Sequence, residues 1–597
     1  MDGRIRRGER DFVALGVNYH PPTAGCDVWS DWRPGELRED FGRIAAAGLN
    51  TVRLFLFWRD AQPAPGQVSS TVLDRLDQAV ASAEAAGLAC VISMFTIWMN
   101  GQVLDLPWRQ GRDIWRDPAM LAEEELLAGS VAKTLRGRAN LLAYDLGDEL
   151  WHIDPRASGS LSRQEVVAWQ GRLAAVIREQ APGALILQAN DAAGTFSQVP
   201  FGGDNSAGLD LIGTHGFPSW APASIESTRC YKATNLVPFL VQAAAAYGTP
   251  FVDELGSYGA GEAVTAGYLR AATASVLANG AAGVLVWCWQ DIAARREPYL
   301  QRPMERNTGL NRLDGTPKPA MSAYQEVVAD APRLTQPRSP AEVAIYLPER
   351  TRAGGGGYLD APASTVAAFY AYLLVKRAHL NVELVAGEPV GQRLVLCPSP
   401  AHLTLTDLER IERWARAGAT VYLSLGDHLH GFAGQELVGA EIVDFNLQDA
   451  TKDELSWGCD TWPLHWDNVP TVPTTMRAVR ARTLAVYPDG SPALVQRRLG
   501  SGQILFTNAP IESQLDQPGL LEATSWQRFY ERLAALAGLT PEVGCSDPDV
   551  EVIPRPGGSA LVINHLDRAA DVELYRNSAR RTVSLASKGW ATVDFSS

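Results

Sequence analysis

The sequence lacks the features that identify disulfide-rich, zinc-binding and membrane proteins. Its seven cysteines are scattered over 597 residues without a CxxC or zinc-ribbon spacing, and their odd number argues against a disulfide framework. The longest apolar run, 281–289, is far too short to cross a bilayer. The N-terminal apolar run, 12–17, is shorter than the hydrophobic region of a signal peptide. We therefore expect a cytoplasmic protein that has no membrane partner.

Positive charge is scarce as well. The formal net charge is −14 and no useful Lys/Arg-rich run occurs, whereas a nucleic-acid-binding protein needs a basic face. Tryptophan, in contrast, is abundant, with 17 copies. This number is compatible with core packing, but tryptophan is also a side chain on which sugars stack. The composition thus argues against a nucleic-acid partner and leaves a carbohydrate ligand open.

The first 330 residues alternate between short apolar runs and helical stretches. Because the apolar runs are continuous rather than alternating, they predict strands that are buried on both faces of a parallel sheet. Eight such βα units predict an α/β fold that begins with a (β/α)8 TIM barrel. The predicted strands are 12–20, 51–58, 89–95, 141–149, 184–191, 209–217, 250–256 and 283–291. The predicted helices are 36–48, 72–87, 119–135, 162–181, 235–247, 262–279 and 319–330, with a loop at 192–208.

The rest of the chain shows two further patterns. Residues 331–340 contain three prolines and are typical of a linker. Strands and helices then alternate again, which predicts a doubly wound, flavodoxin-like or amidotransferase-like α/β domain. From 546 onward, short strands around a Pro-Gly-Gly turn predict a small antiparallel β domain. The predicted domains are the barrel at 1–335, the doubly wound domain at 341–545 and the β domain at 546–597.

Polar and aromatic residues follow the barrel strands where each strand ends. In a (β/α)8 barrel these carboxyl ends form the active site. Glu149 ends the fourth strand and Glu254 the seventh, so the two side chains can meet across the barrel mouth. Glycoside hydrolysis with retention needs two carboxyls about 5–5.5 Å apart and no cofactor. The other candidate binding residues are Arg53, Trp58, Asp148, Asn190, His215, Trp287 and Trp289.

The motifs around these residues resemble glycoside hydrolase clan A, families 5 and 42 in particular. They are NTVRLF at Arg53, LGDE at Glu149, THGF at His215, FVDELG at Glu254 and VWCW at Trp287. The resemblance implies a retaining β-glycosidase with Glu149 as acid/base and Glu254 as nucleophile. The three-part layout is similar to that of family 42 β-galactosidases and some exo-acting β-mannosidases and β-glucosaminidases. The resemblance also implies that the second domain is non-catalytic and that the protein forms a homo-oligomer, either a dimer or a trimer.

One position departs from the resemblance. Clan A enzymes usually have Asn before the acid/base, where its amide contacts the 2-hydroxyl of the sugar, but this sequence has Asp148. An ionised carboxylate only accepts hydrogen bonds, so it suits a donor at carbon 2, and an ammonium suits it best. This favours a 2-amino sugar such as glucosamine, although mannose and galactose stay open.

The predicted activity is hydrolysis of terminal β-linked hexoses from oligosaccharides or glycosides by double displacement. The alternatives are an endo-acting glucanase or mannanase and a non-catalytic sugar-binding barrel. Two features of the second domain carry no predicted chemistry. His428 and His430 are interpreted as loop histidines without further metal ligands, and Cys397 is flanked by prolines rather than by a nucleophile elbow. We therefore predict no metal site.

Overall fold

The structure, a computed structural model, describes residues 4–7, 10–196, 199–206, 208–259, 261–348, 365–400, 403–426, 434–446, 450–467, 469 and 471–595. The chain forms two compact units. The first comprises Met1–Thr195, Val199–Ala221 and Leu236–Gln336, and the second comprises Phe196–Gln198, Pro222–Asn235 and Pro337–Ser597. Two segments of the second unit, 196–198 and 222–235, lie within the range predicted for the barrel, so the predicted domain bounds stay a prediction. The further division of the second unit at 545 stays a prediction.

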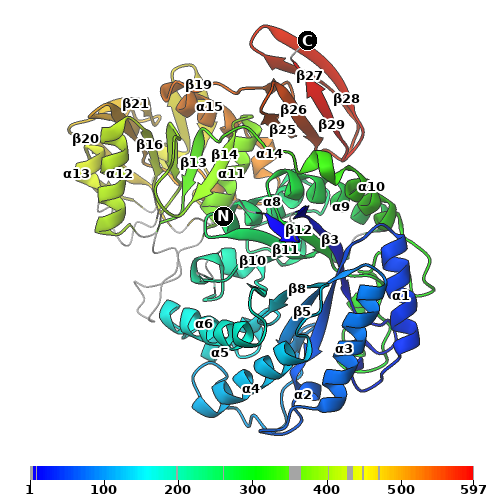
Figure 1. Ribbon diagram of the computed structural model, residues 1–597. Helices are drawn as coiled ribbons and strands as arrows, with labels where there is room; N and C mark the ends of the chain where they lie inside the picture. The colour runs from blue at the N-terminus through cyan, green and yellow to red at the C-terminus, as the bar shows by residue number, and fades with distance from the viewer. Residues whose placement is uncertain are drawn as a thin grey trace. The chain divides into compact units, whose positions relative to one another are not determined.

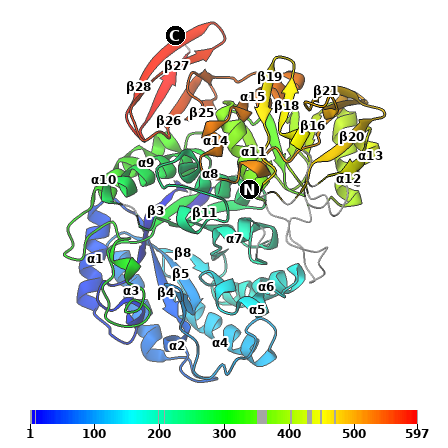
Figure 2. The same ribbon diagram turned by 180° about the vertical axis from the view of Figure 1, so that it is seen from behind.

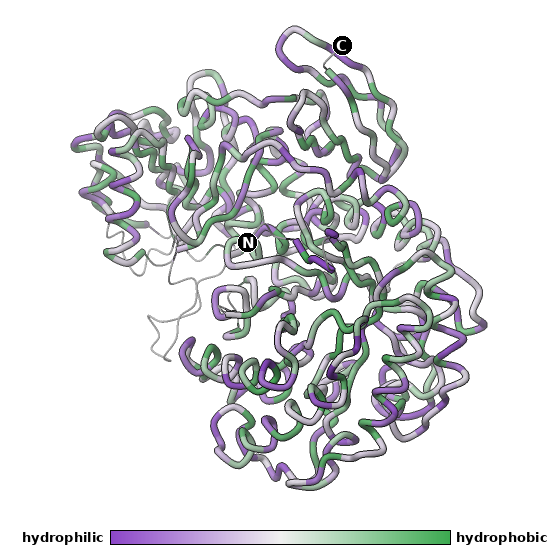
Figure 3. The backbone as a smooth tube through the Cα atoms, viewed as in Figure 1, coloured by the Kyte–Doolittle hydropathy of each residue, from purple (hydrophilic) through white to green (hydrophobic). Residues whose placement is uncertain are grey.

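The first unit contains a closed barrel of eight parallel strands, which confirms the predicted fold class (Figure 1). All residues of six of these strands are buried, as their continuous apolar sequences predict, and Figure 3 shows them mostly in the hydrophobic colour. In chain order the barrel strands are β3 (Ala14–Tyr19), β4 (Thr51–Phe57), β5 (Ala89–Thr96), β8 (Leu141–Asp145), β9 (Leu185–Gln188), β10 (Leu211–Gly216), β11 (Thr249–Leu255) and β12 (Gly283–Val286).

Seven long helices surround the barrel strands (Figures 1 and 2). Three of them have side-chain caps: Ser69 caps α3, Asp117 caps α4, and Ser162 and Glu165 form a capping box on α6. These helices are α1 (Pro34–Ala46), α3 (Ser70–Ala85), α4 (Pro118–Thr134), α6 (Arg163–Gln180), α8 (Tyr231–Ala245), α9 (Glu262–Ala278) and α10 (Pro319–Leu334). Shorter elements of this part are β1 (Ile5–Arg7), β2 (Arg10–Phe12), α2 (Trp58–Ala61), β6 (Trp98–Met99), β7 (Gln102–Val103) and α5 (Pro155–Ser158).

Two local predictions for this unit need correction. The segment 192–208, predicted as a loop, contains α7 (Ala192–Thr195) and a 3-10 helix, Gly203–Asn205. The predicted linker begins too early, because α10 continues to Leu334 with Pro332 inside it. A proline removes only one backbone donor, and the buried side chains of Ala331 and Leu334 hold this last turn in place. The linker therefore begins four residues later than its proline content predicts, because packing extends the helix to Leu334.

The second unit contains a nine-stranded sheet with a parallel, doubly wound half, as predicted. Its parallel strands lie in the order β14 (Val382–Val385), β13 (Val343–Tyr346), β15 (Leu394–Cys397), β16 (Thr420–Ser424) and β23 (Gly502–Thr507). The predicted helices correspond to α11 (Val366–Arg377), α12 (Leu405–Ala417) and α15 (Trp526–Leu536). Four antiparallel strands, which were not predicted, extend the same sheet beyond β23. They are β22 (Pro492–Leu499), β21 (Arg482–Val486), β18 (Glu454–Trp457) and β19 (Asp460–Pro463).

The C-terminal residues form short antiparallel strands, as predicted. The Pro-Gly-Gly turn joins β25 (Val550–Arg555) to β26 (Ser559–Asn564), which pair in register from Val550↔Asn564 to Arg555↔Ser559. The other strands here are β24 (Gly544–Cys545), β27 (Ala570–Arg576), β28 (Ala579–Leu585) and β29 (Trp590–Asp594). The remaining small elements of the second unit are α13 (Gln435–Val438), β17 (Ala440–Phe445), β20 (Thr474–Ala478) and α14 (Leu520–Ala523). Among the described residues, no helix has the length and apolar character needed to cross a membrane.

Candidate active site

Four acidic side chains surround Arg53 at the carboxyl ends of the barrel strands. Arg53 lies in β4, and its side chain is 0% exposed. Its Nη1 donates to Glu254 Oε1 (2.8 Å) and Asn18 Oδ1 (3.2 Å). Its Nη2 contacts Asp145 Oδ2 (2.7 Å), Asp148 Oδ1 (2.8 Å), Ser93 Oγ (3.3 Å) and Asp253 Oδ2 (3.9 Å). One buried guanidinium thus links side chains from β3, β4, β5, β8, β11 and the turn after β8.

The charge of Arg53 is fixed by these neighbours. Burial lowers the pKa of the guanidinium, but Asp145 and Asp148 outweigh burial and the pKa is raised well above its usual value. The guanidinium also lies over the ring of Phe55, 4.5 Å from its centroid. Arg53 is therefore a permanent cation beside Glu254.

His215 supplies a second cation among the same carboxylates. It lies in β10, and its Nε2 is 3.2 Å from Asp253 Oδ2 and 3.8 Å from Asp148 Oδ1. Its Nδ1 is 2.8 Å from Glu149 Oε1 and 3.7 Å from Glu254 Oε2. Burial lowers the pKa of His215, but Glu254 and Asp253 together raise it well above its usual value. The imidazole therefore favours the protonated form, in which both of its nitrogens donate.

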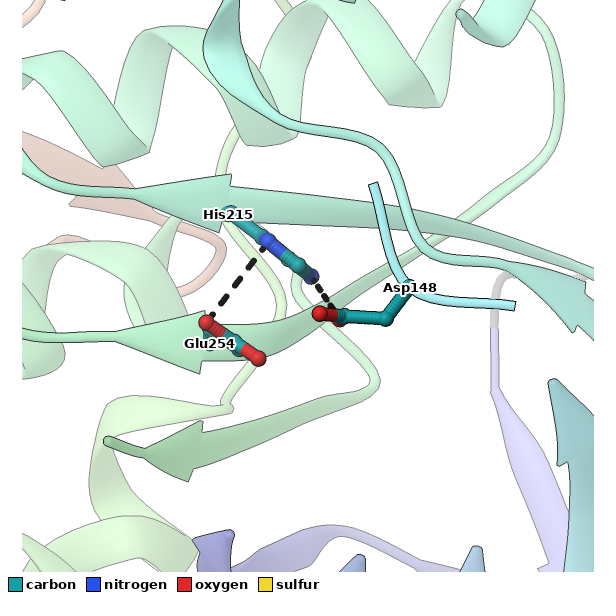
Figure 4. Close-up of side chains that lie close together, drawn as sticks. All are labelled: Asp148, His215 and Glu254. Carbon is teal, nitrogen blue, oxygen red and sulfur yellow. Dashed lines mark ion pairs between the residues drawn. The ribbon is translucent and has the colours of Figure 1, made fainter. Parts of the chain in front are cut away.

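Asp148 and Glu254, the two carboxyl groups on either side of His215, have raised pKa values. Figure 4 shows His215 between them, with an ion pair to each. Burial raises the pKa of Asp148 to about 6, against the opposing effects of Arg53 and His215. Burial also raises the pKa of Glu254, although His215 lowers it. Because more carboxylates than cations are buried here, the cluster retains protons that a solvated carboxylate would have lost.

A tight turn after β8 places Glu149. Its backbone is left-handed, with φ 40° and ψ 49°, which is uncommon for a residue other than glycine. Two residues earlier, Gly147 has φ 135°, and a Cβ there would lie 2.6 Å from Leu150 Cδ2. The Leu-Gly-Asp-Glu sequence thus folds a turn that ordinary side chains do not fit. The turn holds Glu149 next to His215 while Asp148 reaches Arg53.

Aromatic side chains border the other oxygen of Glu149. Trp98 Nε1 donates to Glu149 Oε2 (3.2 Å), and His152 Nε2 lies 3.4 Å from the same oxygen. The ring of His152 stacks on Trp98, with centroids 4.3 Å apart and planes 7° from parallel. His152 Nε2 is also 3.2 Å from Asp191 Oδ2, which accepts a hydrogen bond from Trp151 Nε1 (2.7 Å). Glu149 is therefore held between two imidazoles.

The three tryptophans that were predicted to bind sugar, Trp58, Trp287 and Trp289, have different neighbours in the structure. Trp58 is 0% exposed, donates to Gln62 and packs edge-on against Phe95 and Trp108, so it is a core residue. Trp289 is 2% exposed and is directed toward α1, where its Nε1 contacts Asp40 and Arg43 lies over its ring. Both rings are buried in this conformation, and their predicted contact with a sugar stays a prediction. Trp287 packs against Phe55, which lies under the guanidinium of Arg53, and so borders the cluster.

Asn190 lies beside the cluster along the chain, but its amide group is directed to the backbone. Its Nδ2 donates to the carbonyls of Gln188 (3.0 Å) and Gly213 (3.2 Å). Its Oδ1 is buried without a hydrogen-bond partner among the described residues. In this conformation the amide supports the loop after β9, and its predicted contact with a sugar stays a prediction.

Several residues of the cluster were not among the predicted site residues: Asn18, Ser93, Asp145, His152, Asp191 and Asp253. All of them lie in or just after a barrel strand, which is the signal that could have identified them. The sequence does not show which of two neighbouring acids, such as Asp253 and Glu254, faces which cation. That choice depends on the bulge that shifts the register between β10 and β11 after Thr214.

Two groups of side chains have the geometry to share a metal ion. In the described part of the chain these are Asp148, His215 and Glu254, and Glu149, His152 and Asp191, with ligand atoms within 4.8 Å of one another. In both groups the carboxylates already accept hydrogen bonds from Arg53, Trp98 or Trp151. An ion bound at either group would therefore share these carboxylates with the internal donors. His428 and His430 lie outside the described residues.

Comparison with solved structures places this fold among glycosidases. An exo-β-1,4-mannosidase from Opitutaceae bacterium strain TAV5 is 25% identical, aligns over 90% of this chain and 98% of its own, and has a TM-score of 0.76. A GH5_18 enzyme from Streptomyces cattleya in complex with Manβ1-4GlcNAc is 23% identical over 65% of this chain and 100% of its own, with a TM-score of 0.59. A GH42 β-galactosidase from G. stearothermophilus, a catalytic mutant, is 14% identical over 99% of both chains, with a TM-score of 0.74.

No protein-family model and no curated protein matches the sequence. The exo-β-1,4-mannosidase and the GH42 β-galactosidase nevertheless align with 90% and 99% of this chain. The neighbours named GH5_18 and GH42 come from the two families whose motifs the sequence resembles. The comparison confirms the resemblance to the clan A glycoside hydrolases, and the chain has the fold of a β-glycosidase of this clan.

Proposed function

We propose that the protein is a retaining exo-β-glycosidase in which Glu254 is the nucleophile and Glu149 the general acid/base. The observation that carries this proposal is that both carboxylates face the same nitrogen, His215 Nδ1, at 2.8 and 3.7 Å. Such an arrangement favours the separation of about 5–5.5 Å found in retaining enzymes over the roughly 6.5–9.5 Å of inverting ones.

The reaction has two steps. Glu254 attacks the anomeric carbon while Glu149 gives its proton to the departing glycosidic oxygen, which leaves a covalent glycosyl-enzyme. Glu149 then takes a proton from water, and the resulting hydroxide equivalent displaces Glu254 from the sugar. Arg53 Nη1, 2.8 Å from Glu254 Oε1, stabilises this carboxylate in its ionised form before the attack and after its release.

Exo action is supported by two loops that bridge one side of the barrel mouth. β12 and β5 are separated in the ring by β3 and β4, yet the loops that follow them touch. Asn100 Nδ2 donates to Arg302 O (2.8 Å), and Gln102 Nε2 donates to Glu297 (3.0 Å) and Gln301 (3.1 Å). An endo-acting enzyme needs a cleft that is open at both ends. The bridge therefore favours removal of terminal sugars.

The sugar is a hexose with a hydrogen-bond donor at carbon 2. Asp148 Oδ1 accepts from Arg53, which leaves Oδ2 for that donor. A mannoside is the first substrate to test, since the neighbour that shares 25% identity over nearly its whole chain is an exo-β-1,4-mannosidase. Glucosamine is the alternative, because an ammonium would form a charge-assisted bond to Asp148.

The proposal is tested with nitrophenyl β-mannoside, β-galactoside, β-glucoside and β-glucosaminide. We expect Glu149→Gln and Glu254→Gln to lose nearly all turnover of whichever sugar is cleaved, while Glu326→Gln, an exposed glutamate paired with Arg270, serves as the matched control. Proton NMR at early times should detect the β-anomer first. Wild-type turnover by either active-site variant would refute the assignment of the pair, and an α-anomer as first product would refute retention.

A further inference from the structure

A second histidine contacts the proposed acid/base, on the side away from His215. We infer that His152, held in place by Asp191, is a positioning residue that stabilises Glu149 as it loses its proton to the leaving group. This inference rests on the proposed role of Glu149. The contact that carries it is the approach of His152 Nε2 to Glu149 Oε2, at 3.4 Å.

The two oxygens of Glu149 have different partners. Oε1 lies 2.8 Å from His215 Nδ1, and a protonated His215 donates there. Oε2 accepts a hydrogen bond from Trp98 Nε1 (3.2 Å) and lies 3.4 Å from His152 Nε2. Each oxygen of the ionised carboxylate therefore has an imidazole beside it, and His152 is the one at Oε2.

The ring of His152 is fixed on both faces and at one edge. It stacks on Trp98 and packs against Trp151, whose ring centroid lies 4.0 Å away. Its Nε2 also approaches Asp191 Oδ2 at 3.2 Å, and Trp151 Nε1 donates to that same oxygen at 2.7 Å. The backbone N–H of His152 donates to Glu149 O (3.0 Å), which ties the two residues to one turn. These contacts hold the imidazole of His152 close to Glu149 Oε2.

The surroundings of His152 favour its charged form. Burial lowers the pKa of His152, but the hydrogen bond to Asp191 and the charge of Glu149 raise it above its usual value. The charged groups that face His152 are Asp191 from the loop after β9 and Glu149 and Asp148 from the turn after β8. Those that face Glu149 are His152, His215 from β10, Asp148 and Glu254.

The chemical consequence concerns the first step of the reaction. When the proton moves from Glu149 to the glycosidic oxygen, negative charge develops on the carboxylate and is shared by Oε1 and Oε2. A protonated His152 stabilises that charge and keeps its own proton throughout, and water returns the proton of Glu149 in the second step. The gain in rate from His152 is therefore largest for leaving groups that must be protonated as they depart. It is small for leaving groups that depart as stable anions.

The test compares leaving groups on the sugar that the enzyme cleaves. His152→Phe keeps an aromatic ring that can stack on Trp98 but removes the nitrogen. We expect it to lower kcat/KM about 10–100-fold for a methyl or phenyl glycoside, a part of the roughly 10²–10⁴-fold that general acid catalysis contributes. For the dinitrophenyl glycoside, which needs no acid, we expect less than about a 3-fold loss. His152→Gln, which restores a donor, should recover part of the loss, and Asp191→Asn should show the same dependence on the leaving group more weakly.

The outcomes separate this inference from the proposed function. An equal loss by His152→Phe on all leaving groups indicates a merely structural role and overturns the inference, as does no loss on any of them. Glu149→Gln is measured in parallel on the same substrates. If it also lacks a dependence on the leaving group, the role of Glu149 fails; if it shows a steep dependence while His152→Phe does not, only the inference fails. Should His152→Phe fold poorly in a circular dichroism melt, His152→Gln decides by the same criterion.

Discussion

Replacing Arg53 by methionine should destabilise the protein strongly and in a pH-dependent way. The guanidinium holds Asp145, Asp148 and Glu254 at 2.7–2.8 Å, and its side chain is completely buried. Removing one partner of a buried ion pair leaves an uncompensated charge, at a cost of about 3–5 kcal/mol. The carboxylates can reduce this cost only by binding protons, because methionine offers no donor.

Proton binding sets the direction of the pH effect. The pKa values of Asp148 and Glu254 are already raised in the native protein, and loss of Arg53 raises them further. The folded variant then binds protons that the unfolded chain releases, so its stability falls as pH rises above the pKa of an unfolded carboxyl. Each extra bound proton contributes about 1.4 kcal/mol per pH unit. Between pH 6 and pH 8, one such proton enlarges the deficit by about 3 kcal/mol.

Urea unfolding followed by tryptophan fluorescence, at pH 6 and pH 8, measures both effects. Arg270→Met is the matched control: its partner Glu326 is 52% exposed, and such surface pairs contribute only about 0–1 kcal/mol. The reasoning is refuted if Arg53→Met unfolds at the wild-type urea concentration at pH 8. It is also refuted if the difference from wild type shrinks, rather than grows, between pH 6 and pH 8.

Two further predictions concern substrate recognition. Because burial raises the pKa of Asp148 to about 6, kcat/KM for a β-glucosaminide should fall as pH drops through about 6, where the carboxylate loses its charge. Asp148→Asn should remove this dependence and the preference for the amino sugar; an unchanged profile would contradict a contact between Asp148 and carbon 2. Trp287→Phe should raise KM. Trp289→Phe removes a contact with Asp40 in α1 instead, so it should lower the melting temperature and leave KM within about 2-fold of wild type.

The barrel could be predicted from the sequence because its signal is strong and repeated. All eight strands were predicted in their correct places, since continuous apolar runs followed by amphipathic helices leave few other folds. The ends of the strands were predicted less well. β8 ends at Asp145 and β12 at Val286, in both cases before the residues that were assigned to the strand end. Beyond those points the backbone makes only isolated hydrogen bonds to its neighbours, such as Leu146 N–H to Leu187 O and Trp287 N–H to Leu255 O.

The sequence pointed to both glutamates of the candidate site, but it did not identify Asp145, Asp191 or Asp253 as members of the cluster. A glutamate at the end of a barrel strand has few structural reasons to be there, so Glu149 and Glu254 were informative. A tryptophan near a strand end packs equally well into the core. Trp58 and Trp289 do so at 0% and 2% exposure, and Trp287, at 4%, is buried almost as fully. Burial therefore does not separate these three side chains, whereas Trp98 is only partly buried. His152 was hidden because its partner, Asp191, lies 39 residues further along the chain.

The aspartates of the cluster explain how the site can change charge without losing its geometry. Asp145 Oδ2 binds Arg53, while its Oδ1 accepts the backbone N–H groups of Gly147 (3.0 Å) and Ala189 (3.2 Å). Asp253 Oδ2 is 3.2 Å from His215 Nε2. Each cation is therefore held by an acid that takes no part in the proposed reaction. When the reacting glutamates alternate between charged and neutral forms, these contacts keep both cations in position, so their field acts on the developing charge without first having to rearrange.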